Sequence, residues 1–332
     1  MTIGELAKML NLSKSTVSYA LNNGPKPVSP EVKQRVLKAA EEFGFRPNPV
    51  ARSLANRRSR TIGFIPNALN PATMYSAYAA VFLQSTFSLA HERELHLLLP
   101  SGYDPARSDE TREHLFNAPV DGFILLLPEN LSALRDIIEQ GRPMIAIAGK
   151  TDGLIPSINA DNALGASQAF DHIWSLGHRK IAYLGSTTES DTSIRFITTE
   201  TLFSRVHSEF EQSWLIRSGA NYDLSLVVAR ELLSQKTIPT AIICVNDLVA
   251  SAVLRAALEL RIRVPEQLSI IGFDDDSVAR TMPIPLSTIR QPIPEMAVAA
   301  MDGILAQIEG NSFEDQTLAT SLIVRETTTA PP

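Results

Sequence analysis

The sequence predicts two structural parts, a small all-α head and a larger α/β core built from two doubly wound parallel sheets. Three short amphipathic helices and a strong positive charge are confined to residues 1–60. From residue 61 onward, continuous apolar runs alternate with helical stretches, a pattern typical of parallel sheets covered by helices on both faces. A chain of 332 residues is long enough for two or three compact units.

The formal net charge of −6 conceals a segregation of charge along the chain. Residues 1–60 hold eleven Lys and Arg against four acids, a net charge of +7. The remainder holds nineteen Lys and Arg against thirty-two acids, a net charge of −13. This distribution predicts that only the basic head meets a polyanion, such as double-stranded DNA.

The chain carries the features of a cytoplasmic protein. Its single cysteine, Cys244, cannot form an internal disulfide, and the flanking AIICV predicts a thiol packed in a buried strand. No apolar run approaches the roughly 20 residues of a membrane span. The start MTIGELAKML lacks the pattern of a signal peptide, so we expect no membrane association.

The first residues predict two helices joined by a short turn. Thr2 and Glu5 form a T-x-x-E capping box that starts the first helix. Asn11 tolerates the left-handed backbone of a turn, and Ser13 is the natural cap of a second helix over residues 14–21. The apolar positions expected to face inward are Leu6, Ala7, Leu10, Val17 and Leu21.

A third helix completes the head. Ser29 is its expected cap, Pro30 takes its first position, and Gly44 closes it. Its expected inner face consists of Val32, Val36, Ala40 and Phe43. Helix, short turn, helix and third helix together form the helix-turn-helix arrangement.

The second helix presents polar groups and no acid on its outer face. The outward set is Lys14, Ser15, Thr16, Ser18, Tyr19 and Asn22. Such short polar groups bond well to base edges and phosphates in the major groove, whereas an acid would be repelled by phosphate. Alternatively, the hydroxyls only cap a small helical bundle. The segregated charge favours DNA binding.

The segment FRPNPVARSLANRRSR, residues 45–60, predicts a linker that folds against a partner. A helix beginning near Pro49, with Val50, Ala51 and Leu54 on one face, is too short to persist alone in water. Arg52 and the other basic residues indicate that this partner is DNA, with Leu54 as an apolar wedge in the minor groove. The alternative is a solvated tether between domains.

The apolar runs of the core predict strands. They are TIGFIP, LHLLLP, DGFILLL, MIAIA, KIAYLG, TAIICV and LSIIGF, with helical patterns between them, for example over residues 77–91, 131–140, 163–176 and 248–260. So many units indicate two lobes. Ligands of such folds bind at the carboxyl ends of the strands, here in a cleft between the lobes.

An enzymatic core is not favoured. No G-x-G-x-x-G follows a strand, and neither G-x-x-x-x-G-K-[ST] nor G-x-S-x-G is present. His178 is expected to end a helix beside Gly177, and three consecutive aspartates, Asp274–Asp276, are not expected to converge on one ion. We therefore expect no catalytic residue, cofactor or metal. A periplasmic solute-binding protein would explain the core alone, but not the basic head.

Several stretches together resemble the LacI/GalR family of bacterial repressors. They are LAKMLNLSKSTVSYALNN, VSPEVKQRVLKAAEEFGFRPNPVARSLANRRSRTIGF, NDLVASAVLRAALELRIRVPEQLSIIGFDDD, STIRQP and the final VRETTTAPP. The resemblance implies a helix-turn-helix domain over residues 1–46, a hinge helix and linker over 47–60, and a periplasmic-binding-protein-like core over 61–332. It further implies a nucleoid-associated homodimer on a pseudo-palindromic operator, with a small-molecule effector in the cleft.

The resemblance also implies the lobe boundaries and the DNA contacts. The chain is expected to cross between lobes near Asn159–Asp161, near Ile289–Gln291 and at about residue 317. The N-lobe then takes about 61–159 and 291–316, and the C-lobe about 160–290 and 317–330. With the hinge leucine at Leu54, the expected DNA-binding set is Thr2, Lys14, Ser15, Thr16, Ser18, Tyr19, Asn22, Asn48, Ala51, Arg52 and Leu54.

The expected effector-binding set is Ala72, Thr73, Arg195, Tyr222, Asn246 and Asp274. In the family the acid at Asp274 bonds to ligand hydroxyls and the arginine at Arg195 contacts the effector, while Asp247 is expected to cap the next helix. The alternative for each residue is a strand-end cap or a surface position.

Departures from the family concern mainly the effector. Tyr19 replaces a usual arginine of the recognition helix, which alters the expected base preference. Ala148, in IAGK, stands where sugar-responsive relatives have the Asp of I-D-R, and residues 186–214 lack R-x-x-G-[FY] after Arg195. The expected effector is a sugar, sugar acid or related metabolite. The departures disfavour a plain monosaccharide and favour an acidic or altered ligand, or none.

Overall fold

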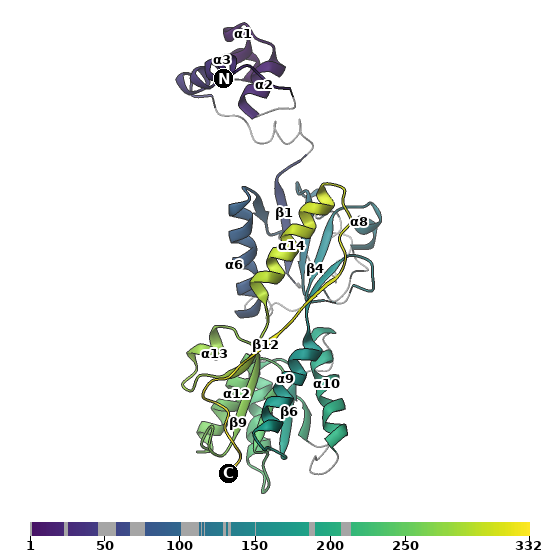
Figure 1. Cartoon of the computed structure of the whole chain (residues 1–332), viewed down its shortest axis with the longest axis vertical. Coiled ribbons are helices and arrows are strands. Elements are labelled where there is room, and N and C mark those ends of the chain that lie inside the picture. The colour runs from purple at the N-terminus through teal and green to yellow at the C-terminus, as the bar shows by residue number, and fades with distance from the viewer. Residues whose placement is uncertain are drawn as a thin grey trace. The chain divides into compact units, whose positions relative to one another are not determined.

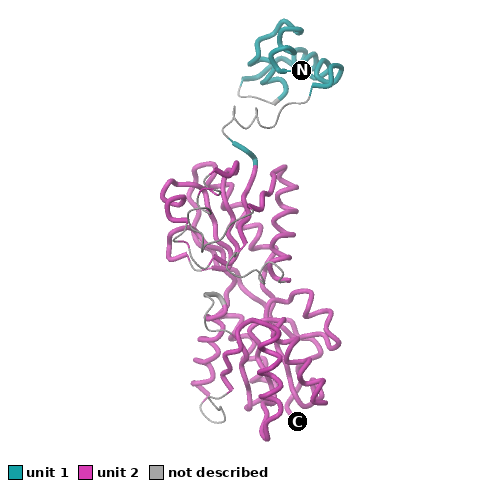
Figure 2. The backbone as a smooth tube through the Cα atoms, turned by 180° about the vertical axis from the view of Figure 1, so that it is seen from behind, with its two compact units in different colours: residues 1–60 teal, residues 61–332 magenta. Residues whose placement is uncertain are grey.

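The computed structural model describes residues 2–22, 26–45, 58–66, 77–100, 113, 115, 117–128, 131, 134–149, 151–185, 190–206 and 214–332. The chain divides into two compact units, residues 1–60 and residues 61–332 (Figure 2). None of the helices within the described residues combines the length and the apolar composition that a membrane crossing requires.

The described part of the head contains three helices. They are α1 (Ile3–Leu10), α2 (Lys14–Asn22) and α3 (Pro30–Glu42). The predicted capping box is present, because the Thr2 N–H donates to Glu5 Oε2 at 2.7 Å and the Glu5 N–H to Thr2 Oγ1 at 3.3 Å. The buried residues that hold the three helices together are Leu6, Ala7, Val17, Ala20, Val36, Ala39 and Ala40.

A left-handed residue makes the turn between α1 and α2. Asn11 has φ 54° and ψ 44°, as expected from its tolerance of this backbone region. The Asn11 N–H donates to Lys8 O, and the Leu12 N–H donates to Ala7 O at 2.9 Å. This is the Schellman pattern, which satisfies carbonyls at the end of α1 and returns Leu12 to the core of the head.

The prediction that Phe43 faces the core is wrong. Phe43 is 48% exposed, and Phe45 packs against the core of the head instead. The reason is a second Schellman turn, in which Gly44 has φ 62° and the Phe45 N–H donates to Ala40 O at 2.8 Å. The helical period ends at Glu42, so the spacing that places Val36 and Ala40 inward does not extend to Phe43.

Replacing Phe45 with Ala is expected to destabilise the head more than replacing Phe43 with Ala. Phe45→Ala removes packing from the head core at a cost of about 1–3 kcal/mol, whereas Phe43 is half in solvent already. Amide hydrogen exchange of α1 and α3 in the full-length protein measures both effects. Equal acceleration of exchange in the two variants would contradict this packing.

The first sheet of the body is entirely parallel. Its strands, in spatial order, are β11 (Gln316–Leu318), β5 (Ser157–Ala160), β4 (Met144–Ile147), β3 (Gly122–Leu126), β1 (Thr61–Pro66) and β2 (His96–Leu98). Helices α6 (Ala77–Glu92) and α14 (Ile293–Ile308) pack on one face, against residues such as Ile145 and Ile147. The opposite face, with Phe123 and Met144, is covered by α8 (Arg135–Glu139), which is shorter than predicted.

The second sheet is parallel except at one edge. Its strands, in spatial order, are β12 (Ser321–Ile323), β10 (Ser287–Arg290), β9 (Ser269–Asp274), β8 (Ala241–Cys244), β6 (Ile181–Gly185) and β7 (Leu215–Arg217). Only β12 runs antiparallel to its neighbour, β10. The flanking helices are α9 (Asn162–Ser175), α10 (Ser190–Val206), α11 (Tyr222–Leu233), α12 (Asp247–Glu259) and α13 (Ser277–Thr281).

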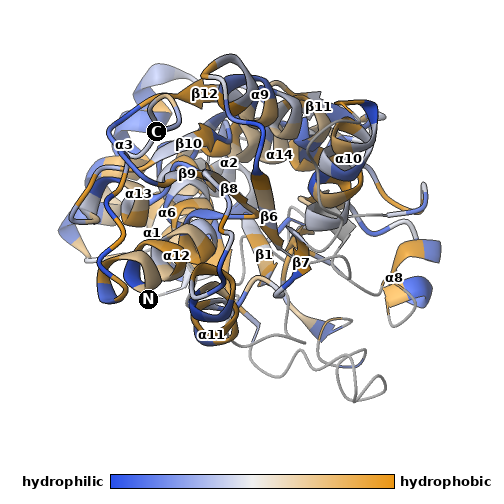
Figure 3. Ribbon diagram, turned by 90° about the horizontal axis from the view of Figure 1, so that it is seen from below, coloured by the Kyte–Doolittle hydropathy of each residue, from blue (hydrophilic) through white to orange (hydrophobic). Residues whose placement is uncertain are grey.

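The arrangement of each sheet between helices follows from the sequence pattern, in which continuous apolar strands alternate with helices that are apolar on one side and polar on the other. Strands such as β6 are coloured largely hydrophobic in Figure 3, whereas α11 carries both polar and apolar residues. The core of this lobe includes Cys244, whose thiol is 1% exposed, so the predicted packed thiol is confirmed. Burial raises the pKa of the Cys244 thiol well above its ordinary value, which keeps it protonated.

The body therefore consists of two lobes, one for each sheet, and the chain crosses between them three times. The crossings lie between β5 and α9, between β10 and α14, and between β11 and β12 (Figure 1). The second crossing is short, because β10 ends at Arg290 and α14 begins at Ile293.

A buried histidine attaches the C-terminal tail to the second lobe. Helix α9 ends at Ser175, and Gly177 follows with φ 99°. The prediction that His178 ends this helix is wrong, because His178 lies beyond Gly177. His178 Nδ1 lies 2.9 Å from Thr240 Oγ1, and Nε2 lies 2.8 Å from Thr329 O. These bonds fit the neutral tautomer with its proton on Nε2. Burial lowers the pKa of His178 below its ordinary value.

The stability of the body is expected to fall as the pH drops below about 6.5, because the unfolded chain then takes up a proton that buried His178 resists. His178→Gln is expected to lower the melting temperature near pH 7.5. The melting temperature of this variant should then fall less than that of the unsubstituted protein between about pH 7.5 and 5.5. Thermal denaturation measures both, with exposed His91→Gln as the control. An unchanged pH slope in the His178 variant would contradict this assignment.

Candidate functional site

The outer face of α2 is partly engaged in its own hydrogen bonds. Ser13 caps the helix as predicted, because its Oγ accepts the Thr16 N–H at 3.0 Å. The same Oγ lies 2.7 Å from Ser15 Oγ and 2.8 Å from Thr16 Oγ1. Lys14 and Ser15 are exposed, whereas Thr16 is half-buried. The first turn of α2 therefore presents one ammonium group and a connected cluster of hydroxyls.

The remaining residues of the expected DNA-binding set differ in their surroundings. Ser18 and Tyr19 are half-buried, and Thr2 is exposed while its backbone and side chain complete the capping box of α1. The expected residues that lie outside the described part of the chain are Asn48, Ala51, Arg52, Leu54, Ala72 and Thr73, together with the side chain of Asn22.

The structure brings Arg195 and Asp274 together in the second lobe. Arg195, near the start of α10, is 5% exposed and lies with its Cζ 3.7 Å from the centroid of the Phe273 ring. Its Nε donates to Asn162 Oδ1 at 2.7 Å, and its Nη1 to Val245 O at 2.7 Å. Nη1 also lies 3.4 Å from Asp274 Oδ1. The guanidinium is thus held by partners from three segments of the lobe, the start of α9, the end of β8 and the end of β9.

Asp274 joins this cluster to the second crossing. Its Oδ1 accepts a hydrogen bond from Gln291 Nε2 at 2.7 Å, and Gln291 Oε1 accepts a longer one from Tyr78 Oη at 3.4 Å. Tyr78 belongs to α6 of the first lobe, so a short chain of contacts links the two lobes through the crossing. Asp274 has φ 113°, which is strained for any residue with a Cβ, and such strain is typical of functional positions.

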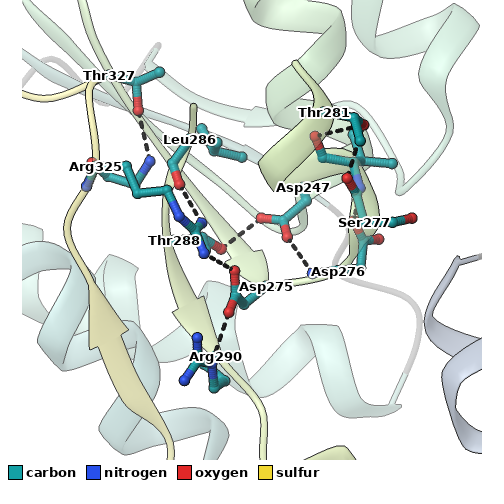
Figure 4. Close-up of polar contacts among 12 residues, drawn as sticks. Asp247, Asp275, Asp276, Ser277, Thr281, Leu286, Thr288, Arg290, Arg325 and Thr327 are labelled. Atoms are coloured by element: carbon teal, nitrogen blue, oxygen red, sulfur yellow. Dashed lines mark hydrogen bonds and ion pairs between the residues drawn. The ribbon is translucent and has the colours of Figure 1, made fainter. Parts of the chain in front are cut away.

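The prediction that Asp247 caps α12 is wrong. Asn246 is the cap, because its Oδ1 accepts the Val249 N–H at 2.8 Å. The Asp247 carboxylate is fully buried instead, accepting the Thr288 hydroxyl at 2.6 Å and the Asp276 N–H at 3.0 Å (Figure 4). A Cβ at Gly272 would collide with this carboxylate, so glycine is required there. Asn246 itself is half-buried at the end of β8.

The consecutive aspartates after β9 have separate partners. Asp275 lies between Arg290 and Arg325, which come from β10 and the C-terminal tail (Figure 4). Asp276 caps α13 through the Val278 N–H at 2.7 Å. Burial raises the pKa of both Asp276 and Asp247, and the nearby negative charge of Asp274 raises the pKa of Asp247 further.

Tyr222 and Ala148 complete the expected site residues within the described chain. Tyr222 is half-buried at the first position of α11, which follows β7. Ala148 is fully buried just after β4, in the core of the first lobe, and has φ 55°. A methyl group therefore occupies the position at the end of β4 where the resemblance implies an aspartate in sugar-responsive relatives.

Tyr183 is a polar residue of this lobe that sequence reasoning missed. Its ring is 1% exposed and packs edge-to-face on Phe196, with centroids 5.6 Å apart. Within the described part of the chain, Tyr183 Oη is the one buried side-chain nitrogen or oxygen that makes no hydrogen bond. An unpaired buried hydroxyl costs about 1–3 kcal/mol. Burial also raises the pKa of the phenol above its ordinary value.

Comparison with known proteins agrees with the division into head and body. Residues 2–48 match the model for bacterial regulatory proteins of the lacI family, and residues 170–328 match that for a periplasmic binding protein-like domain. The chain is 30% identical to the HTH-type transcriptional regulator DegA of Bacillus subtilis, over 89% of this chain and 88% of that protein. The chain belongs to the LacI family.

Other members of the LacI family match over nearly the whole chain. The ribose operon repressor of Haemophilus influenzae is 28% identical, over 96% of this chain and 95% of that protein. The structure of the lac repressor dimer bound to operator and an anti-inducer superimposes with a TM-score of 0.84 at 22% identity, covering 99% of both chains. The protein thus has the LacI-family fold, a helix-turn-helix head and a periplasmic-binding-protein-like core.

In this member of the LacI family, Arg195 is part of the folded core of the lobe. Replacing Arg195 with Met is expected to cost about 3 kcal/mol in the free energy of unfolding, because Asn162 and the Val245 carbonyl lose a charged donor. Urea denaturation followed by tryptophan fluorescence reports on this lobe, which contains Trp174 and Trp214. The control is Arg255→Met, in a surface ion pair with Glu259, which is expected to change stability far less.

Proposed function

We propose that this protein is a regulator of transcription, most simply a repressor, that binds a pseudo-palindromic operator as a homodimer under the control of a small-molecule effector. The observation that carries the proposal is the match of both parts of one chain, head and body, to regulators of the LacI family. The alternative, a small-molecule-binding protein with a basic tether, leaves the ordered three-helix head unexplained.

In this proposal α2 enters the major groove and the linker contacts the minor groove. The exposed ammonium of Lys14 binds phosphate, and the hydroxyl cluster formed by Ser13, Ser15 and Thr16 exchanges its mutual hydrogen bonds for bonds to bases and phosphates. Residues 47–60 form the hinge, with Leu54 as the wedge. The acidic body, with a net charge of −13, stays away from the duplex. The protein acts at the bacterial nucleoid.

The effector binds at the carboxyl ends of the strands, between the lobes formed by residues of about 61–159 with 291–316 and 160–290 with 317–330. Asp274 and Arg195 are its proposed anchors, with Asn246, Tyr222, Ala72 and Thr73 around it. Because Asp274 is bonded to Gln291 at a crossing, a ligand that engages Asp274 also acts on the connection to α6. Such a ligand favours one arrangement of the lobes, and operator affinity changes by linkage.

A duplex selected from a random library with full-length protein tests DNA recognition directly. Leu54→Ala is expected to weaken binding to the selected duplex by more than tenfold while changing binding to random duplex little, because the wedge acts only on a correctly bent site. Leu37→Ala, at an exposed leucine of α3, is the matched control. Fluorescence anisotropy measures both affinities.

An equal loss of specific and nonspecific binding in Leu54→Ala would make the linker a tether only. Failure of the full-length protein to enrich any sequence from the library, at low ionic strength, would contradict the proposal that it is a regulator of transcription.

A further inference from the structure

The unpaired hydroxyl of Tyr183 lies at the carboxyl end of β6, the edge of the sheet where ligands of this fold bind. Tyr183 is two residues from the end of the strand, and its ring extends toward that end. A Cβ built on Gly185 would lie 2.7 Å from Tyr183 Oη and 2.6 Å from the Cβ of Val245. The absence of a side chain at Gly185 therefore leaves space for the Tyr183 phenol to reach the end of the strand.

Arg217, on the neighbouring strand β7, has no carboxylate partner among the described residues. Arg217 ends β7 and is paired in register with Gly185 of β6, so its side chain leaves the sheet on the same face as Tyr183. Arg217 is exposed, and its Cζ lies 5.4 Å from the centroid of the Phe196 ring, on which Tyr183 also packs. None of the described carboxylates forms an ion pair with Arg217.

Arg195 supplies a second cation at the same edge. It immediately precedes Phe196 in α10, and it donates to the carbonyl of Val245, the residue that also adjoins Gly185. Its described hydrogen bonds use Nε and Nη1. Donors and positive charge thus gather around the ends of β6, β7 and β8.

Negative charge is placed at the other side of this edge. Asp274 ends β9, and its Oδ1 already accepts from Gln291 and Arg195. In the first lobe, the buried methyl group of Ala148 stands at the end of β4, where the resemblance to sugar-responsive relatives implies an aspartate. The balance of groups at the ends of β6 and β7 therefore suits a ligand that accepts hydrogen bonds and carries negative charge.

We propose that the effector carries an anionic group, a carboxylate or a phosphate, and that Tyr183, Arg195 and Arg217 bind it at the carboxyl ends of β6 and β7. This inference rests on the proposed function, since it names the ligand class of the same effector site. The hydroxyl groups of the ligand lie toward Asp274, whose carboxylate is already paired with Arg195 at 3.4 Å, and the anionic group lies toward Arg217 at the end of β7. The ligand supplies the acceptor that the Tyr183 hydroxyl lacks.

Sugars that differ at one carbon test the charge requirement. The probes are glucose, glucuronate and glucose 6-phosphate, the three corresponding galactose derivatives, and ribose, ribonate and ribose 5-phosphate. At least one anionic member is expected to raise the melting temperature of the full-length protein and to bind in calorimetry, while its neutral counterpart does neither. Comparison of the sugar acids with the sugar phosphates shows whether a carboxylate or a phosphate is recognised.

Conservative variants then test Tyr183 and Arg217. Tyr183→Phe removes only a hydroxyl that makes no hydrogen bond in the folded protein, so it is expected to keep or raise the melting temperature. It should nevertheless weaken anion binding about tenfold or more, as expected for a lost hydrogen bond to a charged group. Arg217→Gln should weaken anion binding at least as much. The matched control is Arg205→Gln, at an exposed arginine of α10, the helix that carries Arg195. This variant should leave anion binding unchanged.

Three outcomes would overturn the inference. They are binding of the neutral sugars only, binding of none of the anions, and anion binding that Tyr183→Phe and Arg217→Gln leave intact. Operator binding by the same variants is measured without ligand. Binding of neutral sugars only, together with intact operator recognition, would contradict the anionic effector and leave the proposed regulator of transcription in place. Binding of an anion without operator recognition would contradict the proposed regulator and leave the anion-binding site in place.

Discussion

A carboxylate buried at the end of a strand needs hydrogen-bond donors, and the second lobe is arranged around this requirement at Asp274. The backbone of Asp274 has φ 113°, so the surrounding structure holds it in a conformation that the chain alone would avoid. Its donors come from distant segments, Gln291 at a crossing and Arg195 on α10. An unpaired charge in this position would be strongly destabilising, so helix, strand and crossing must meet here.

The neighbouring acids extend the same principle to the rest of the lobe. Asp247 connects the start of α12 to β10, and Asp275 connects β10 to the C-terminal tail through Arg290 and Arg325. Each carboxylate therefore ties together segments that are far apart in sequence. Because Asp274 is bonded to Gln291, the same network that stabilises the second lobe also reaches a crossing between the lobes.

The head obeys simpler rules, and it depends on local signals. Two Schellman turns, at Asn11 and Gly44, end its helices and return Leu12 and Phe45 to a small core. Its positive charge and its hydroxyl-rich α2 need no contribution from the body. This independence is consistent with a LacI-family architecture, in which one chain combines a DNA-binding head with a separate ligand-binding body.

Local sequence predicted those elements whose physical cause is local. The helices of the head carry their caps within three residues, and seven strands lie within continuous apolar runs of the sequence, even where the strand itself is as short as β2, so all of them were predicted. The strands β5, β7, β10, β11 and β12 are short and contain polar residues, so no continuous apolar run marks them, and they form because a neighbouring strand offers its hydrogen bonds. The misplaced Phe43 shows that helical spacing gives no warning of where a helix ends.

For the candidate site, the sequence by itself determined which residue types are available, and resemblance to the family pointed to Arg195 and Asp274. Only the tertiary structure decided that these two side chains meet, that Gln291 joins them to a crossing, and that Tyr183 is left without a partner beside Gly185. The physical reason is that burial and hydrogen bonding depend on groups brought together from distant strands. Spacing along a single segment carries no information about such partners.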